Sequence, residues 1–342
     1  MAFLIPYHRD MQRRMNMKLH WKEWAIAALL GLAMPGIILA VATTLGPQET
    51  LIELGTADLA EEIRETETQP VPITVPVLNG NQAADMELNE YLVGVVLAEM
   101  PASFEPEALK AQAVVARTYT MRSYRRGGRH KNAAVCTDPS CCQAYTAPED
   151  YLKKGGTKKN VEKIRQAVED TGNEVLTYNG ELIEAVYFSC SGGSTEDAVA
   201  VWGTSYPYLQ AVSSPGEEKA DHYSDTVTYT ASNFAAALGR DLKGNPNEWF
   251  GVTTYTPGGG VASMEIGGTV YKGTTLRTVL GLRSTAFMIS TTDSKVTITT
   301  KGYGHRVGMS QYGADAMALE GSTYREILTH YYQGVTLTTL EN

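Results

Sequence analysis

The sequence predicts an α+β protein: an N-terminal transmembrane helix followed by a mixed α/β catalytic domain that contains an α+β subdomain. Two observations lead to this prediction. An apolar run without a charged residue occupies 24–45 and is long enough to span a bilayer. After residue 71, helical periodicities alternate irregularly with short strand-like runs and Gly, Pro or Asn turn signals.

The first 45 residues predict a single-pass membrane anchor. Residues 1–23 form a basic cytoplasmic tail, because positive charge before a span keeps that end inside the cell. A cleaved signal peptide is the alternative, since Ala40-Val41-Ala42 resembles a cleavage site. The apolar run is longer than a signal core of about 7–15 residues, which favours an uncleaved anchor in the cell membrane. The C-terminal domain is therefore expected to be extracytoplasmic.

The rest of the chain is expected to be a tethered domain that binds no nucleic acid. Residues 46–70 are rich in acidic side chains and form a solvated linker. The net charge is −9, and the only basic blocks are the N-terminal tail and 122–131, so a nucleic-acid partner is not expected. The domain spans 71–342, and 204–302 form its α+β subdomain. Nineteen tyrosines against six phenylalanines suit a groove that binds sugar.

The segment 88–100 contains the candidate catalytic residue, Glu99. Leu92, Val95, Val96 and Glu99 follow helical spacing, so the carboxyl group is expected at the end of an apolar stripe. Pro101 ends the helix. Burial and the negative end of the helix dipole both disfavour a carboxylate there. The pattern predicts a raised pKa, as a general acid requires, although a solvated helix-end glutamate is the simpler interpretation.

Further elements follow from periodicity and turn signals. A helix begins at Pro106, ends at Gly127-Gly128 and carries Gln112 and Arg117 as candidate polar site groups. Asn179-Gly180 predicts a hairpin. The other expected elements are an edge strand at 71–78, a helix at 160–171, subdomain strands at 227–230, 261–266 and 295–300, subdomain helices at 234–238 and 276–280, a last helix at 324–332 and a last strand at 335–340.

One short segment combines a histidine with three cysteines. His130, Cys136 and Cys142 could hold zinc, with a fourth position left for water or an outside ligand. On the oxidising side of the membrane, a disulfide among Cys136, Cys141, Cys142 and Cys190 is the alternative. The spacing alone does not decide between the two.

Two glycine-rich loops are candidate binding sites. The hairpin runs through Tyr187 into 189–194, a small and hydroxyl-rich loop that lets a ligand approach the backbone. The second loop, 302–313, places His305 beside the start of a helix that Ser310 can cap. The candidate ligand-binding residues of the two loops are Tyr187, Ser189, Ser191, Gly192, His305, Ser310, Gln311 and Tyr312.

Three separated motifs resemble the stage II sporulation protein D family. They are 97–101 with 107–119, then 189–193, then 304–313, in that order. The resemblance covers about 70–340, and the N-terminal anchor resembles that of the membrane-bound members. Arg306 departs from the pattern, because the family usually has glycine after the histidine.

The resemblance implies a peptidoglycan lytic transglycosylase that acts during endospore engulfment. Glu99 matches the position of the family's catalytic acid, and the loop residues would bind or orient the glycan. The substrate would be glycan strands from which an amidase has removed the stem peptides. Partners would be a sporulation amidase or endopeptidase and a membrane scaffold protein. Because some members hold zinc with a His and two Cys, the resemblance also favours zinc over the disulfide.

Three other functions are compatible with parts of the sequence. The family also includes an amidase enhancer, so a non-catalytic glycan-binding module is one alternative. Cys190 with His305 could form a thiol hydrolase, although no orienting partner is predicted. A zinc peptidase fits less well, because a cysteine-rich site favours a structural metal.

Overall fold

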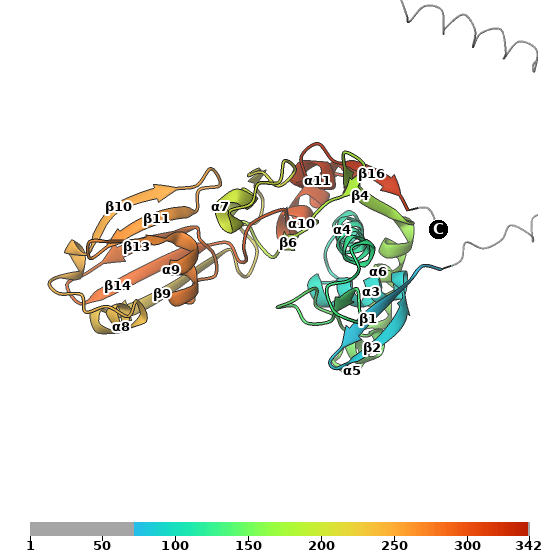
Figure 1. Ribbon diagram of the computed structural model, residues 1–342, viewed down its shortest axis with the longest axis horizontal. Helices are drawn as coiled ribbons and strands as arrows, with labels where there is room; N and C mark the ends of the chain where they lie inside the picture. Colours follow the sequence, from blue (N-terminus) through green and yellow to red (C-terminus); the bar gives the residue numbers. More distant parts are fainter. Residues whose placement is uncertain (1–71, 341–342) are drawn as a thin grey trace, which may run out of the picture. The chain divides into compact units, whose positions relative to one another are not determined.

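The computed structural model describes residues 72–340. The predicted basic tail, the anchor and the whole acidic linker lie outside the described residues. Within 72–340, no helix combines the length and apolar character needed to cross a bilayer. The described residues form a mixed α/β structure, as predicted, with a larger and a smaller hydrophobic core (Figure 1).

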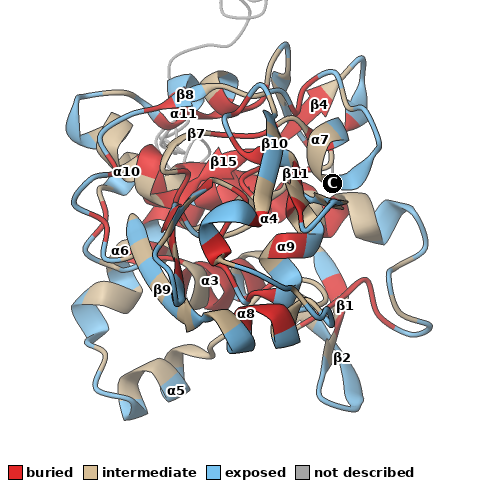
Figure 2. Cartoon of the chain, turned by 90° about the vertical axis from the view of Figure 1, so that its left-hand side faces the viewer, coloured by how far each residue is buried: buried red, intermediate tan, exposed pale blue. Residues whose placement is uncertain are grey.

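The larger core is built on two buried helices. α3 (Leu88–Glu99) and α4 (Pro106–Arg125) pack on each other and against α6 (Lys158–Asp170). α10 (Gln311–Leu319) and α11 (Tyr324–Tyr331) pack on α4. Figure 2 shows the buried residues gathered around α3 and α4, whereas α5 (Pro148–Lys153) has none.

The two central helices begin and end as the sequence indicates, but α3 is more deeply buried than a single stripe. Tyr91, Val93 and Leu97 are buried as well as the predicted stripe. The Glu87 carboxylate caps α3 by accepting hydrogen bonds from two backbone N–H groups. Pro106 occupies the first turn of α4, where its missing N–H costs nothing.

The first sheet corrects the predicted edge strand. β1 (Thr74–Asn79) is the middle strand, between β2 (Gln82–Glu87), which is antiparallel, and β3 (Val135–Cys136), which is parallel. Pro76 is tolerated there because β3 is only two residues long and its pairing begins at Val77. The Pro76 carbonyl still accepts a 2.8 Å hydrogen bond from the Ala134 N–H.

The Asn179-Gly180 hairpin is confirmed, but its second strand is short. β4 (Glu174–Tyr178) pairs with β5 (Glu181–Leu182) and with β16 (Thr336–Thr339). Both turn residues have positive φ, 52° and 82°. The chain then forms β6 (Tyr187–Phe188), which runs parallel to β15 (Met309–Ser310). This pairing places the two glycine-rich loops side by side.

The smaller core lies within 204–302, the range that the sequence predicts as a subdomain. β13 (Phe287–Thr291), β14 (Lys295–Lys301) and β9 (Ser224–Thr230) form one sheet. The second sheet has the order β10-β11-β12, and only its central strand, β11 (Val261–Ile266), was predicted, because the outer strands carry exposed apolar side chains such as Val252 and Val270. The remaining elements of the subdomain are β10 (Phe250–Tyr255), β11 (Val261–Ile266), β12 (Thr269–Lys272), α8 (Ala231–Ala237), η1 (Pro246–Glu248) and α9 (Gly273–Val279).

Candidate active site

A cavity of about 420 Å³ lies where the end of α3, β6 and the His305 loop meet. Six predicted site residues line it: Glu99, Cys142, Tyr187, Ser189, His305 and, from the start of α10, Gln311. Glu99 is the only carboxyl group in this lining, and the lining contains neither lysine nor arginine. The cavity therefore offers one carboxyl group for acid–base chemistry, among side chains that carry no carboxyl, ammonium or guanidinium group.

The Glu99 carboxyl is held from several directions. Glu99 is the last residue of α3, and its Oε1 accepts a 2.7 Å hydrogen bond from the Ala144 N–H. Burial raises the pKa of Glu99, while interactions with Ala144, Tyr187 and Gln311 lower it to a smaller extent. The Tyr187 hydroxyl is buried close to the Glu99 carboxyl, but the geometry between them is not that of an ordinary hydrogen bond. Burial therefore favours the protonated acid.

The raised pKa of Glu99 predicts a pH-dependent stability difference between wild type and Glu99→Gln. Below the unfolded-state pKa both carry a neutral side chain and should be equally stable. As the pH rises through the folded-state pKa, wild type must bury a carboxylate and loses stability relative to the variant. In thermal melting from pH 4 to pH 8, the Tm of Glu99→Gln should rise relative to that of wild type as the pH increases. A constant difference in Tm across this range would contradict the raised pKa.

His305 is a neutral group packed among rings. It lies between Phe188 and Trp202, with ring centroids 5.7 and 5.3 Å away. Its Nδ1 accepts a 3.1 Å hydrogen bond from the Val307 N–H, and its pKa is lowered to about 4 by burial and by the charge of Arg277. A neutral His305 can shape the cavity and donate a hydrogen bond, but it cannot act as a charged acid near neutral pH.

The structure places six of the predicted binding residues outside the cavity lining. Gln112 lies behind Gln311, with 3.5 Å between its Oε1 and the Gln311 Nε2. Arg117 is fully buried and donates to Thr171, Val168 and Glu174, so it holds α4 to its neighbours. The remaining four are Ser191, Gly192, Ser310 and Tyr312.

Ser191 and Gly192 bind the carboxylate of Glu217, a residue that no sequence pattern singled out. Their N–H groups donate to Glu217 Oε2 at 2.6 and 3.0 Å, and the Cys190 thiol lies 3.1 Å from the same oxygen. Glu217 is buried and also accepts from the Ser214 hydroxyl. The loop 189–194 is therefore fixed around Glu217 rather than left open for a ligand.

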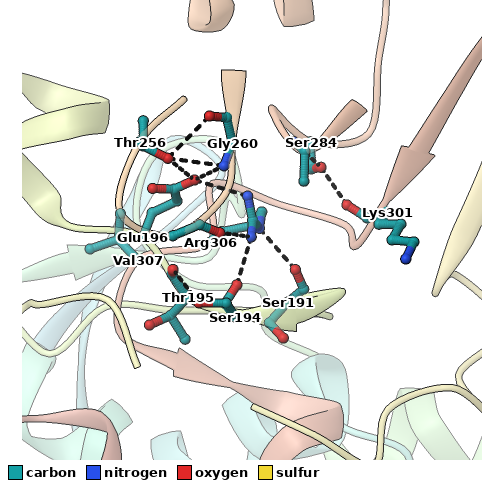
Figure 3. Close-up of polar contacts among 12 residues, drawn as sticks. Ser191, Ser194, Thr195, Glu196, Thr256, Gly260, Ser284, Lys301, Arg306 and Val307 are labelled. Carbon is teal, nitrogen blue, oxygen red and sulfur yellow. Dashed lines mark hydrogen bonds and ion pairs between the residues drawn. The ribbon is translucent and has the colours of Figure 1, made fainter. Parts of the chain in front are cut away.

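Arg306 explains how the loop 302–313 accommodates a residue other than glycine. Its φ is 67°, in the left-handed region that glycine usually occupies. Its buried guanidinium is paired with Glu196, with 2.9 Å between Nη1 and Oε1, and Figure 3 shows the two side chains facing each other. The guanidinium also donates to the carbonyls of Ser191, Ser194 and Gly258. These contacts join both loops to the subdomain and offset the backbone strain.

Ser310 and Tyr312 complete the start of α10. Ser310 caps the helix as predicted, accepting a 3.2 Å hydrogen bond from the Gly313 N–H. The Tyr312 ring packs edge-on against Phe104 at 5.0 Å. Both residues therefore position Gln311, which faces Glu99, without lining the cavity themselves.

His130, Cys136, Cys141 and Cys142 converge into one cluster, which adds Cys141 to the predicted set. Their ligand atoms all lie within 4.8 Å of one another. The cysteines are free thiols, with 3.9 Å between the Sγ atoms of Cys141 and Cys142. Tetrahedral zinc with Zn–S bonds of about 2.3 Å requires sulfur atoms about 3.8 Å apart, so the cluster could hold a metal.

The cluster lies close in the chain to a residue that binds Glu99. Cys142 lines the cavity, and two residues later the Ala144 N–H donates to Glu99. A metal held by the cluster would therefore fix the segment that positions the carboxyl group. Cys190 does not belong to the cluster, and its thiol lies against Glu217 instead.

Several cavity residues were not predicted. Tyr119 follows Gln112 by seven positions on α4, so the shared helix face could have indicated it. Gln143 adjoins the cysteine pair, and Phe188 lies inside β6. Tyr303 had no signal beyond its place in the glycine-rich loop. The others in the lining are Pro139, Ala185, Val186 and Gly304.

Comparison with known proteins identifies the family of this site. The chain is 41% identical over 287 residues to stage II sporulation protein D of Bacillus amyloliquefaciens, covering 81% of this chain and 83% of the relative. It is 42% identical over 269 residues to the protein of the same name in Bacillus subtilis strain 168, covering 77% and 78% of the two chains. The chain belongs to the stage II sporulation protein D family.

Two further matches agree with this family assignment. The family model described as stage II sporulation protein matches residues 79–178, which contain Glu99 and the His/Cys cluster. The amidase enhancer of Bacillus subtilis strain 168 is 34% identical over 301 residues, covering 72% of this chain and 40% of that protein. The suspected resemblance to the stage II sporulation protein D family is thus confirmed.

Proposed function

We propose that the protein is a peptidoglycan lytic transglycosylase that cleaves glycan strands freed of stem peptides, with Glu99 as its acid and then its base. The observation that supports this most is the single buried carboxyl group in the cavity lining. A glycosidase that uses water normally needs two carboxyl groups. A lytic transglycosylase needs one, because a hydroxyl of its own substrate replaces water.

The proposed reaction uses Glu99 twice. The protonated carboxyl donates its proton to the glycosidic oxygen between N-acetylmuramic acid and N-acetylglucosamine, and the C–O bond breaks. The resulting carboxylate then takes the proton from the C6 hydroxyl of the muramic acid. The C6 oxygen attacks C1 of the same sugar and closes a 1,6-anhydro ring. The Ala144 N–H, which lowers the pKa of Glu99, stabilises the carboxylate between the two steps.

The cellular setting is part of the same proposal. The relatives' names refer to sporulation, and the apolar run at 24–45 is expected to anchor the chain in the membrane with the domain outside. There the domain would meet cell-wall glycan. An amidase or endopeptidase that strips the strands and a membrane scaffold protein are the partners we propose.

The observation that separates this proposal from a non-catalytic amidase enhancer is the environment of Glu99. A glycan-binding module has no need to bury a carboxyl group in its cavity. Mass spectrometry of the products from peptide-free strands tests the proposal, with 1,6-anhydro ends expected. Binding of strands without any cleavage would favour the enhancer function.

A thiol hydrolase does not fit the contacts of Cys190. Its thiol is buried against Glu217, which disfavours the thiolate, and His305 lies in a different set of contacts. A zinc peptidase does not fit the cluster either. One histidine and three cysteines would close a tetrahedral shell and leave no position for a catalytic water.

We propose that the metal is zinc and that it is structural. The donor set of one imidazole and three thiolates is typical of closed zinc sites. His130, Cys136, Cys141 and Cys142 would hold the ion, and the ion would tie the segment from Cys136 to Cys142 together. No step of the reaction needs it.

Metal analysis of the purified domain should find about one zinc per chain. His130→Ala and Cys142→Ser should each lose most of it, because each removes a ligand. Cys190→Ser is the matched control, a buried cysteine outside the cluster, and should retain the zinc. A metal-free wild type with a disulfide among Cys136, Cys141 and Cys142 would contradict the proposal.

A further inference from the structure

Arg277 is a partly buried arginine without a polar partner. Other arginines that are shielded from solvent are paired, for example Arg122 with Glu184 and Arg283 with Asp225. Among the arginines of residues 72–340, only Arg277 is partly buried and has a guanidinium without a hydrogen bond or ion pair. Shielding a charge without a partner is costly, so such a position is typical of a site that awaits a ligand.

The backbone places Arg277 next to the cavity. It lies in the last turn of α9, and its carbonyl accepts a 2.8 Å hydrogen bond from the Leu282 N–H. Arg283, which follows Leu282 in the chain, accepts a 3.0 Å hydrogen bond at its backbone carbonyl from the Gly304 N–H. These two bonds connect the end of α9 to the loop that carries Tyr303 and His305. Both of those residues line the cavity, and the charge of Arg277 lowers the pKa of His305.

Of the cations near the cavity, Arg129 is exposed and already donates to the lining residue Tyr119. At the Tyr303 end, Arg277 is the group that would attract an anion. The lining contains no cation, and His305 is neutral. Arg283 lies over the Tyr303 ring at 5.4 Å, but Asp225 already neutralises it. Glu99, the only carboxyl in the lining, is favoured in its neutral form. A ligand carboxylate at the Tyr303 end of the cavity would therefore meet an uncompensated guanidinium.

We propose that Arg277 is a specificity-determining residue that pairs with the lactyl carboxylate of N-acetylmuramic acid. The inference rests on the proposed function, because it assumes that the cavity binds glycan. In a strand that still bears peptides, this carboxyl is bound in an amide and has no charge. Hydrolysis of the amide frees the carboxylate, which a guanidinium can bind through two parallel hydrogen bonds. Arg277 would thus select strands from which peptides have been removed.

The test compares three substrates: peptide-free strands, the same strands with their lactyl carboxylates converted to methylamides, and strands that retain stem peptides. Wild type should cleave peptide-free strands with a kcat/KM at least about tenfold higher than that for the methylamides. Most of this difference should come from a lower KM for the peptide-free strands. Arg277→Gln should lose this preference and Arg277→Lys should keep part of it. Arg240→Gln, an exposed arginine of the same subdomain, is the matched control and should behave as wild type.

The outcomes separate this inference from the proposed function. Equal cleavage of peptide-free and methylamide strands by wild type, or an unchanged preference in Arg277→Gln, would overturn the role of Arg277 while the lytic activity stood. A preference for peptide-bearing strands would assign the carboxylate to the stem peptide instead. If no strand is cleaved, the role of Arg277 can still be tested by measuring how tightly the same three substrates bind to Glu99→Gln. Tighter binding of the free carboxylates that Arg277→Gln abolishes would support the inference even then.

Discussion

Glu99→Gln should abolish the release of 1,6-anhydro products from peptide-free glycan strands. The amide can still accept the hydrogen bond from the Ala144 N–H, but it can neither donate the acid proton nor remove one from the C6 hydroxyl. General acid–base catalysis contributes a factor of about 10²–10⁴, and this residue would supply both steps. We therefore expect at least about a 100-fold loss in kcat, with KM little changed. Mass spectrometry of the digest measures both the amount and the type of product.

Asp315→Asn is a suitable control for this experiment. Like Glu99, Asp315 is a shielded carboxyl whose pKa burial raises and which accepts a hydrogen bond from a backbone N–H, that of Glu105 at 2.7 Å. It does not line the cavity. The control should retain wild-type activity. Glu99→Gln with undiminished cleavage would refute the proposed mechanism, and hydrolysed ends in place of anhydro ends would indicate water as the nucleophile.

Local patterns predicted the scaffold of the site well. α3 and α4 have the predicted boundaries because proline and glycine end helices for reasons that act within a few residues. The same holds for the Asn179-Gly180 turn and the Ser310 cap. The raised pKa of Glu99 follows from its position at the end of a buried helix, although burial is deeper than the stripe suggested.

The polar contacts between distant segments could not be predicted. Ala144 reaches Glu99 across 45 positions, and Glu217 meets Ser191 across 26. Arg117 was a plausible ligand by type, yet its guanidinium is used to join α4 to β4 and α6. A sequence pattern shows which side chains are polar but not whether the fold has already supplied their partners. For the same reason, only the structure shows that the guanidinium of Arg277 has no partner.

Arg306→Ala should be strongly destabilising. The substitution removes a fully buried guanidinium that pairs with Glu196 and donates to three carbonyls, and it leaves the Glu196 carboxylate buried without its counter-charge. Breaking a buried ion pair in this way costs about 3–5 kcal/mol. For a domain of this size the Tm should fall by about 10 °C. Arg325→Ala, which removes an exposed pair with Glu174, should cost less than about 1 kcal/mol.

Two further variants separate the side-chain contacts of Arg306 from its backbone strain. Arg306→Gly also loses the guanidinium, but glycine accepts a φ of 67° freely, so it should be more stable than Arg306→Ala by about 1 kcal/mol. Arg306→Ala combined with Glu196→Ala should cost less than the sum of the single changes, because no unpaired carboxylate remains. If Arg306→Ala melted within a degree of wild type, the buried pair would not be what joins the two loops to the subdomain. Equal stability of the alanine and glycine variants would instead show that the positive φ imposes no strain, which would explain how this chain tolerates arginine after His305.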